Sequence, residues 1–249
     1  MVQQALIADS YFVPDPNLLV TEDDTPVDNW ASEKHQRLLS GSLYSSWQGR
    51  TFLASANVGI YNTANEPPIV PDVFLSLDVQ VPDNWWEKQN RCYLVWQFGK
   101  PPEVVIEIVS NRVGNELGDK MRRYEQMRVS YYVVFDPSRQ LGESLLRIYE
   151  LRGTRYFEMT DTWLEQVGLG LTLWEGEFEG RGDVWLRWCD QEGNVLPTGD
   201  ERAQQAQQRA EHAESQLEQA EQRAEHAEQR AQLLAEQLRA LGIDPDTLS

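Results

Sequence analysis

Two carboxylates in apolar surroundings are the first residues whose chemistry needs an explanation. Glu107 lies inside VVIEIV, residues 104–109, a β-branched run typical of a strand buried in a sheet. A buried carboxylate without a partner is strongly unfavourable, so Glu107 must meet a cation, a hydrogen-bond donor or water. Asp72 opens a second strand-like run, PDVFLSLDV. Two neighbouring strands that each present a carboxylate predict an oxygen site for a hard divalent cation.

A lysine further along the chain could complete this group. Residues 115–128 are predicted to form a helix with apolar residues at 117, 121, 124 and 127, and Lys120 lies on that stripe. Its ammonium can therefore lean over the sheet toward Glu107. Each residue also has an ordinary structural interpretation: Glu107 paired with an arginine, Asp72 in a turn, and Lys120 snorkelling at the edge of the helix face.

The charges around Lys120 indicate which kind of substrate this part of the chain could attract. The chain has a net charge of −18, so bulk electrostatics does not bring it to nucleic acid. A polyanionic substrate would need a local basic patch, a metal, or both. Residues 112–128 hold five basic and three acidic side chains and are net positive. Arg112, Arg122 and Arg123 are the candidate phosphate contacts in this patch.

The elements that must position these residues follow the order α-β-β-β-α-β, and then hairpins. This order predicts a mixed α/β sheet with flanking helices. The helices are expected at residues 32–47 and 115–128, the strands within 51–62, 71–81, 103–110 and 131–137, and the hairpins at 144–159 and 184–196.

Asp, Glu and Lys, carried in this order by strand, strand and helix, resemble the restriction-endonuclease-like superfamily named after its PD-(D/E)XK motif. More narrowly, the chain resembles the putative restriction endonuclease family. The resemblance rests on VPDVFLSLD, PPEVVIEIVSN, GDKMRRYEQMRVSYYVVFDP and SEKH, over about residues 30–175. The superfamily motif places its lysine two residues after the glutamate, where this chain has Val109. Lys120 matches the position from which the narrower family supplies it.

The resemblance implies a restriction-endonuclease-like core and a DNA endonuclease that uses Mg²⁺, with Mn²⁺ as a substitute. It implies that Asp72, Glu107 and the backbone carbonyl of Ile108 hold the metal. Lys120 would orient the attacking water or stabilise the charge that develops on the phosphate. His35 matches a family histidine and is a possible auxiliary residue. The alternative function is a non-catalytic scaffold with a nuclease-like fold.

The composition changes sharply after residue 195, which predicts a domain at 1–195, a linker at 196–200, a helix at 201–241 and a tail at 242–249. The helix repeats QRAEHAE at 208–214 and 222–228, and Ala or Leu recurs with alternating spacings of 3 and 4. This heptad pattern predicts a coiled coil that forms a homodimer or a weak homo-oligomer. A single solvated helix is the competing interpretation.

Other features concern the cell compartment. There is no apolar run long enough to span a membrane, no signal-peptide pattern at the start, and only two cysteines. A cytoplasmic protein without a membrane partner is expected. Trp85 and Trp86 could stack on bases, but packing in the core or in a lid is the expected use.

Overall fold

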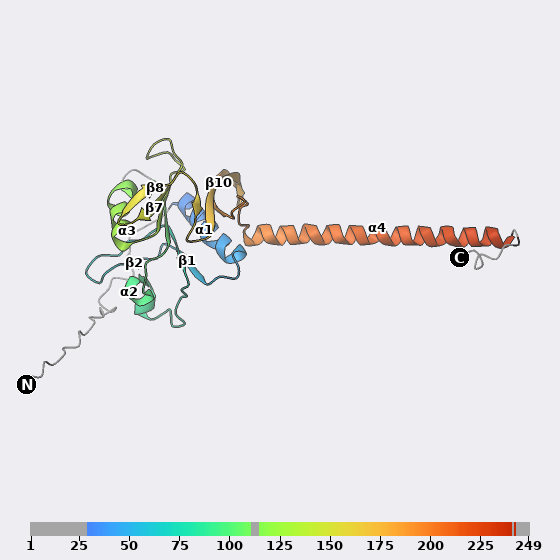
Figure 1. The fold of residues 1–249 in the computed structure, drawn as a ribbon, viewed down its shortest axis with the longest axis horizontal. Helices are drawn as coiled ribbons and strands as arrows, with labels where there is room; N and C mark the ends of the chain where they lie inside the picture. The colour runs from blue at the N-terminus through green and yellow to red at the C-terminus, as the bar shows by residue number, and fades with distance from the viewer. Residues whose placement is uncertain (1–28, 111–114, 241, 243–249) are drawn as a thin grey trace, which may run out of the picture. The chain divides into compact units, whose positions relative to one another are not determined.

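The computed structural model describes residues 29–110, 115–240 and 242. The chain divides into two compact units, Met1–Thr198 and Gly199–Ser249. The first unit is a mixed α/β fold, and the second contains one long helix (Figure 1). The mixed sheet with flanking helices and a long C-terminal helix is therefore confirmed.

A six-stranded sheet forms the centre of the first unit, in the order β1-β3-β5-β6-β7-β8. The β5 and β6 strands are parallel, and all other neighbours are antiparallel. The β7–β8 hairpin confirms the turn predicted within 144–159. The strands are β1 Phe52–Ala56, β3 Val73–Leu77, β5 Val104–Ile108, β6 Tyr131–Phe135, β7 Leu146–Arg152 and β8 Arg155–Glu158.

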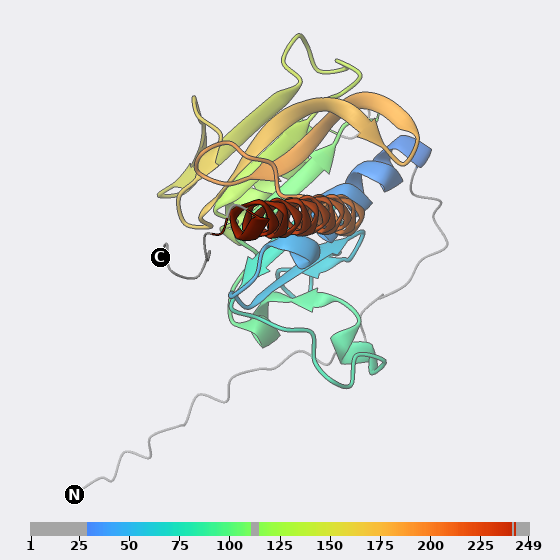
Figure 2. The ribbon, with the colours of Figure 1, turned by 90° about the vertical axis from the view of Figure 1, so that its right-hand side faces the viewer.

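One face of this sheet packs against helix α1 (Trp30–Ser46) and a second sheet. The second sheet contains β9 (Trp163–Leu164), β10 (Leu169–Phe178) and β11 (Arg181–Cys189). Figure 2 shows the long, curved β10–β11 hairpin. Leu39 and Leu43 of α1 share one core cluster with Ile106 of β5 and Trp188 of β11. The Asn29 side chain accepts hydrogen bonds from two backbone N–H groups of the first turn and so caps α1.

The opposite face carries the alternate residues of the same strands, as the two-residue period of a strand requires. Phe74, Val105 and Val134 pack there against Tyr124 and Met127 of helix α3. This face is also covered by short elements from residues 60–98. The elements are α3 Met121–Met127, β2 Ile60–Tyr61, β4 Tyr93–Leu94, the 3₁₀ turn η2 Lys88–Asn90 and α2 Val95–Phe98.

Two predicted elements differ in the structure. The helix expected at 115–128 is a five-residue π turn, η4 (Glu116–Lys120), followed by α3, because the backbone at Gly118 is not helical. Leu117 is consequently exposed instead of lying on a buried stripe. The hairpin predicted at 184–196 is present only in a short form: β11 pairs along its length with β10, and the chain beyond it turns back and pairs with the end of β11 through an antiparallel bridge between Cys189 and Val195.

Helix α4 (Gly199–Ala240) contains 42 residues and begins inside the segment predicted to be a linker. None of its residues is buried. Leu241 and the tail after Gly242 lie outside the described residues. No helix in the described part of the chain is long and apolar enough to cross a membrane.

Candidate active site

The two predicted carboxylates meet because of the register between two neighbouring strands. Val73 of β3 lies opposite Ile106 of β5 in an antiparallel pair. One step further along this register, Asp72 comes opposite Glu107, and opposed residues point to the same face of a sheet. That face is the one that packs against α3, so the carboxylates lie under the segment that carries Lys120.

Both carboxylate oxygens of Glu107 accept hydrogen bonds inside the protein. The side chain is 1% exposed. The Lys120 Nζ donates to Oε2 at 2.8 Å, and the hydroxyl of Tyr124 donates to Oε1 at 2.8 Å. The predicted approach of Lys120 to Glu107 therefore occurs in the structure, although the lysine is the last residue of η4 and not part of a continuous helix.

Val109 stands where the superfamily motif has its lysine. Its side chain is 1% exposed and lies in the core cluster beneath α3. The strand keeps its apolar residue, and η4 delivers the ammonium to Glu107 instead.

Asp72 is held by groups from two other elements. Its Oδ2 accepts a hydrogen bond from the backbone N–H of Ile108 at 2.6 Å. Its Oδ1 accepts one from the Gln36 side chain of α1 at 2.9 Å, and the Asn57 side chain donates in turn to Gln36. These contacts fix the orientation of the carboxylate toward Glu107.

The electrostatics of the site favour a proton or a cation between the strands. Burial raises the pKa of Glu107 to about 8; the Lys120 ammonium opposes this rise, and the Asp72 carboxylate adds to it. Burial alone would lower the pKa of Lys120, but the adjacent Glu107 and Glu116 carboxylates give a net rise, so Lys120 is protonated. Burial, with the negative charge of Glu107, also raises the pKa of Tyr124, which remains a hydrogen-bond donor.

Three polar residues of the site were not identified from the sequence. Gln36 lies three positions before Leu39 on the buried side of α1, and a polar residue on an apolar stripe could have revealed it. Tyr124 was assigned only to the apolar stripe. Glu116 entered the sequence analysis only in the charge count of residues 112–128, but it is 5% exposed. Its Oε1 lies 3.7 Å from Lys120, and its buried Oε2 has no hydrogen-bond partner among the described residues.

His35 is not brought to the carboxylates. Its ring packs against Phe135 and Trp185, with centroid distances of 5.0 and 4.5 Å. Burial lowers the pKa of His35 to about 4, while Asp183 opposes this effect. The auxiliary role of His35 stays a prediction without a contact in support.

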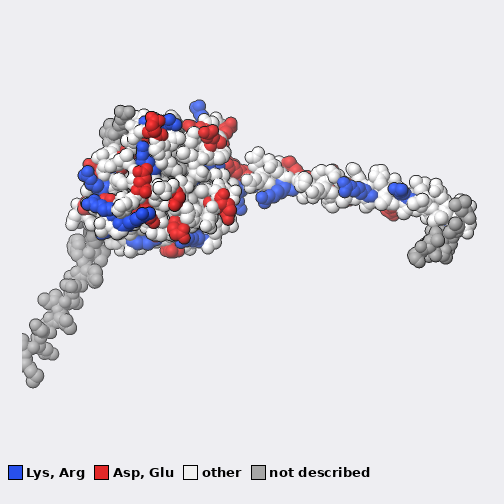
Figure 3. All heavy atoms as spheres, turned by 45° about the horizontal axis from the view of Figure 1, so that its top comes forward, with Lys and Arg blue, Asp and Glu red and all other residues white. Residues whose placement is uncertain are grey.

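Two of the three predicted phosphate contacts, Arg122 and Arg123, lie on α3, the helix that follows Lys120. Arg122 pairs with Asp119 on the surface, and Arg123 donates to the carbonyl oxygen of Pro67. Arg112 lies outside the described residues. In Figure 3, acidic and basic side chains are interspersed on the visible face of the first unit.

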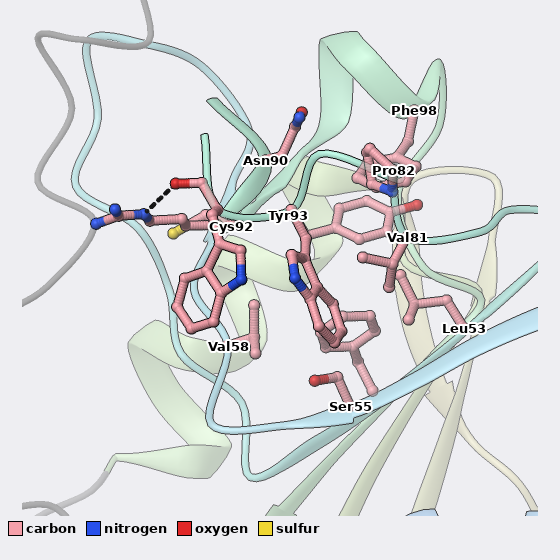
Figure 4. A pocket seen from close by; sticks show the side chains of 13 residues that line it. Leu53, Ser55, Val58, Val81, Pro82, Asn90, Cys92, Tyr93 and Phe98 are labelled. Carbon is pink, nitrogen blue, oxygen red and sulfur yellow. Dashed lines mark hydrogen bonds between the residues drawn. The ribbon is translucent and has the colours of Figure 1, made fainter. Parts of the chain in front are cut away.

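An aromatic pocket of about 490 Å³ opens on the same side of the sheet as Glu107, because Phe74 lines it and shares that face. Tyr93 and Phe98 stack with their ring centroids 4.3 Å apart (Figure 4). Trp85 and Trp86 also line it and are 58% and 78% exposed. These exposures contradict packing of the two tryptophans in the core, while their use in a lid stays a prediction.

The residues present fit a magnesium-type cation better than a zinc-type one. No group of three or more His, Cys, Asp or Glu side chains suited to a metal exists among the described residues. Mg²⁺ is commonly held by one or two carboxylates together with waters and substrate phosphates. Asp72 and Glu107 supply two facing carboxylates, and burial disfavours the free charge on Glu107.

Comparison with known proteins assigns the family. Residues 22–174 match the Uma2 family, described as putative restriction endonucleases. Because the match spans more than half of the chain, the protein belongs to this family, and at that level it is a nuclease-family protein. A crystal structure of a putative nuclease belonging to DUF820 from Anabaena variabilis matches with a TM-score of 0.39 and 16% identity, over 56% of this chain and 73% of that one. No curated protein matches the chain.

Proposed function

We propose that this protein is a divalent-metal-dependent endonuclease that hydrolyses phosphodiester bonds of DNA. The observation that carries the proposal is the meeting of Asp72, Glu107 and Lys120, with a 2.8 Å contact between the lysine and the glutamate. Membership in the family supports the reaction class. The geometry adds which residues would act.

In this proposal, Mg²⁺ is the metal, with Mn²⁺ as a substitute, and Asp72, Glu107 and the backbone carbonyl of Ile108 hold it. Such an ion, when bound, polarises a phosphate and lowers the pKa of a water molecule. The surrounding groups keep the ligands in place: Gln36 and the Ile108 N–H orient Asp72, and Tyr124 orients Glu107. This preorganisation is the contribution of the protein scaffold.

Lys120 would act on the substrate. Its side chain is 31% exposed, whereas Glu107 is almost fully buried, so the ammonium lies at the boundary between the carboxylates and solvent. From that position it can orient a water molecule by donating a hydrogen bond to it, or it can stabilise negative charge that develops on a phosphate. Because Lys120 is held protonated, electrostatic stabilisation is the stronger role.

A non-catalytic scaffold is the second candidate function. The net charge of −18 and the long exposed helix α4 favour it. A scaffold with this fold would keep the Glu107–Lys120 pair for folding and would not respond to divalent metal.

Incubation of the full chain with plasmid and oligonucleotide DNA, in Mg²⁺, Mn²⁺ or EDTA, tests the proposal. We expect metal-dependent cleavage that Glu107→Gln abolishes. Glu103→Gln is the matched control, because Glu103 precedes the same strand and pairs with Lys100, away from the site. The nuclease proposal fails if the wild-type protein leaves DNA intact in both metals, or if Glu107→Gln cleaves as fast as the control.

A further inference from the structure

The charges beside the heptad seam of α4 are sorted by sign. The seam residues occupy the a and d positions, beginning with Ala203 at a and Ala206 at d. The g positions, which precede each a, contain only Arg and Gln, and the e positions, which follow each d, contain only Glu, Gln and Ala. The g residues are Arg202, Arg209, Gln216, Arg223, Arg230 and Gln237; the e residues are Gln207, Glu214, Glu221, Glu228 and Ala235.

This distribution of charges does not stabilise a solitary helix. Helices that are stable alone gain from opposite charges three or four residues apart. Arg209, Arg223 and Arg230 have no carboxylate at either spacing, and Glu214 has Glu211 and Glu218 there. Within residues 203–240 of the described helix, no side chains form a salt bridge with one another.

We infer that α4 binds a second copy of this chain as a parallel, in-register coiled coil. In a parallel pair, each g residue faces the following e residue of the other helix. Arg209 then faces Glu214 of the partner subunit, and Arg223 faces Glu228 of the partner subunit. Because each contact occurs twice by symmetry, four Arg–Glu pairs flank the seam. An antiparallel pair would set g against g and e against e, and would oppose Arg with Arg and Glu with Glu.

The leucines of the seam determine the register. In an in-register parallel pair, each layer contains the same residue from both helices. Leu217, Leu234 and Leu238 then meet their own counterparts, and Ala layers meet Ala layers. A shift by one heptad would set Leu217 against Ala210 or Ala224 and lose that layer of leucine contact. The exposure of Leu217 (60%) and Leu234 (52%) in the single chain is the apolar surface that the pairing removes from water.

The parallel orientation has a consequence for the proposed function. The coiled-coil inference itself does not depend on that function. The chain enters α4 at Gly199 in each copy, so both first units are joined to the same end of the coiled coil. Two nuclease sites at one end suit the cutting of both strands of a duplex.

Charge reversal of the full-length protein, followed by analytical ultracentrifugation, tests the inference. Glu214→Arg/Glu228→Arg turns the four pairs into Arg–Arg contacts, and we expect a rise of roughly 100-fold in the dimer Kd at low salt. Glu211→Arg/Glu225→Arg makes the same change at b positions of the same two repeats, away from the seam, and should leave the Kd unchanged. Adding Arg209→Glu/Arg223→Glu to the first variant restores opposite charges and should restore the dimer.

Two results would overturn the inference. The first is a wild-type chain that sediments as a monomer at tens of micromolar, because α4 is then a solitary helix. A dimer whose Kd is the same in the Glu214→Arg/Glu228→Arg and the Glu211→Arg/Glu225→Arg variants is antiparallel or is formed elsewhere. Circular dichroism of each variant checks that α4 remains helical. None of these measurements uses DNA cleavage, so they are independent of the proposed function.

Discussion

Glu107→Gln keeps the shape of the buried side chain and removes its charge, so it measures what that charge costs the fold. Burial raises the pKa of Glu107 from 4.5 to about 8, and the folded state therefore keeps a proton that the unfolded state releases in this range. The stability that comes from this proton is complete below pH 4.5 and is lost as the pH rises through 8. The loss is about 4 kcal/mol of unfolding free energy between pH 5 and pH 9.

A glutamine in place of Glu107 does not titrate, so the variant should become more stable than the wild-type protein as the pH rises. Lys120 loses its partner but is partly exposed and can turn to water, so this penalty stays nearly constant with pH. Urea unfolding in EDTA, followed by tryptophan fluorescence at several pH values, gives the difference. All nine tryptophans lie between residues 30 and 188, so the signal reports the first unit.

The expected result is a difference in unfolding free energy that grows by about 4 kcal/mol from pH 5 to pH 9. Adding Mn²⁺ at pH 9 should then stabilise the wild-type protein and not the variant, because the cation replaces the proton at Glu107. Parallel pH profiles for the two proteins would refute the reasoning, since they would mean that Glu107 is not held protonated in the fold.

Lys120→Met preserves the side-chain stem and removes the ammonium that lies 2.8 Å from Glu107. We expect this variant to lose DNA cleavage with a nearly unchanged Tm. Full cleavage by the variant would reject the proposed role of this lysine. His35→Phe should reduce the acid sensitivity of the fold. Burial lowers the pKa of His35 to about 4, so its contribution to stability is present above pH 6.5 and is lost as the pH falls toward 4, by roughly 3 kcal/mol. Equal losses of unfolding free energy in the wild-type protein and in His35→Phe over this pH range would contradict the lowered pKa of His35. Trp85→Ala/Trp86→Ala should weaken the binding of a fluorescent single-stranded oligonucleotide about tenfold or more without lowering the Tm, because both rings are exposed. Unchanged anisotropy titrations would exclude stacking on these rings.

The local patterns predicted the central elements and the order of the site residues. A β-branched run around Glu107 and a strand-like apolar run after Asp72 were sufficient for two strands, because burial in a sheet selects these residue types. The position of Lys120 on an apolar stripe indicated that its side chain points toward the sheet. The Lys120 side chain also points toward the sheet in the structure, although the helix is broken at Gly118. The reason is that η4 and α3 both lie over the same face of the sheet.

Contacts between distant segments could not be predicted in the same way. The hydrogen bond from Gln36 to Asp72 depends on how α1 crosses the sheet, and no local pattern encodes that crossing. The hairpin predicted at 184–196 is shortened for a similar reason: a Gly-containing turn follows β11 and is closed by one antiparallel bridge, but the main partner of this strand is β10, which precedes it. Strand pairing is decided by the whole set of available edges and not by the nearest turn.

The Glu107–Lys120 contact separates the folding of this protein from the supply of metal. Many small metal sites are formed only when the ion arrives, because their ligands repel one another without it. Here Lys120 and Tyr124 donate hydrogen bonds to the two oxygens of Glu107, and the raised pKa lets the side chain keep a proton below about pH 8, so the buried group is satisfied without an ion. The fold around Glu107 therefore does not need the proposed metal to satisfy this side chain. If the proposed metal binds here, chelation is expected to remove it without unfolding the protein.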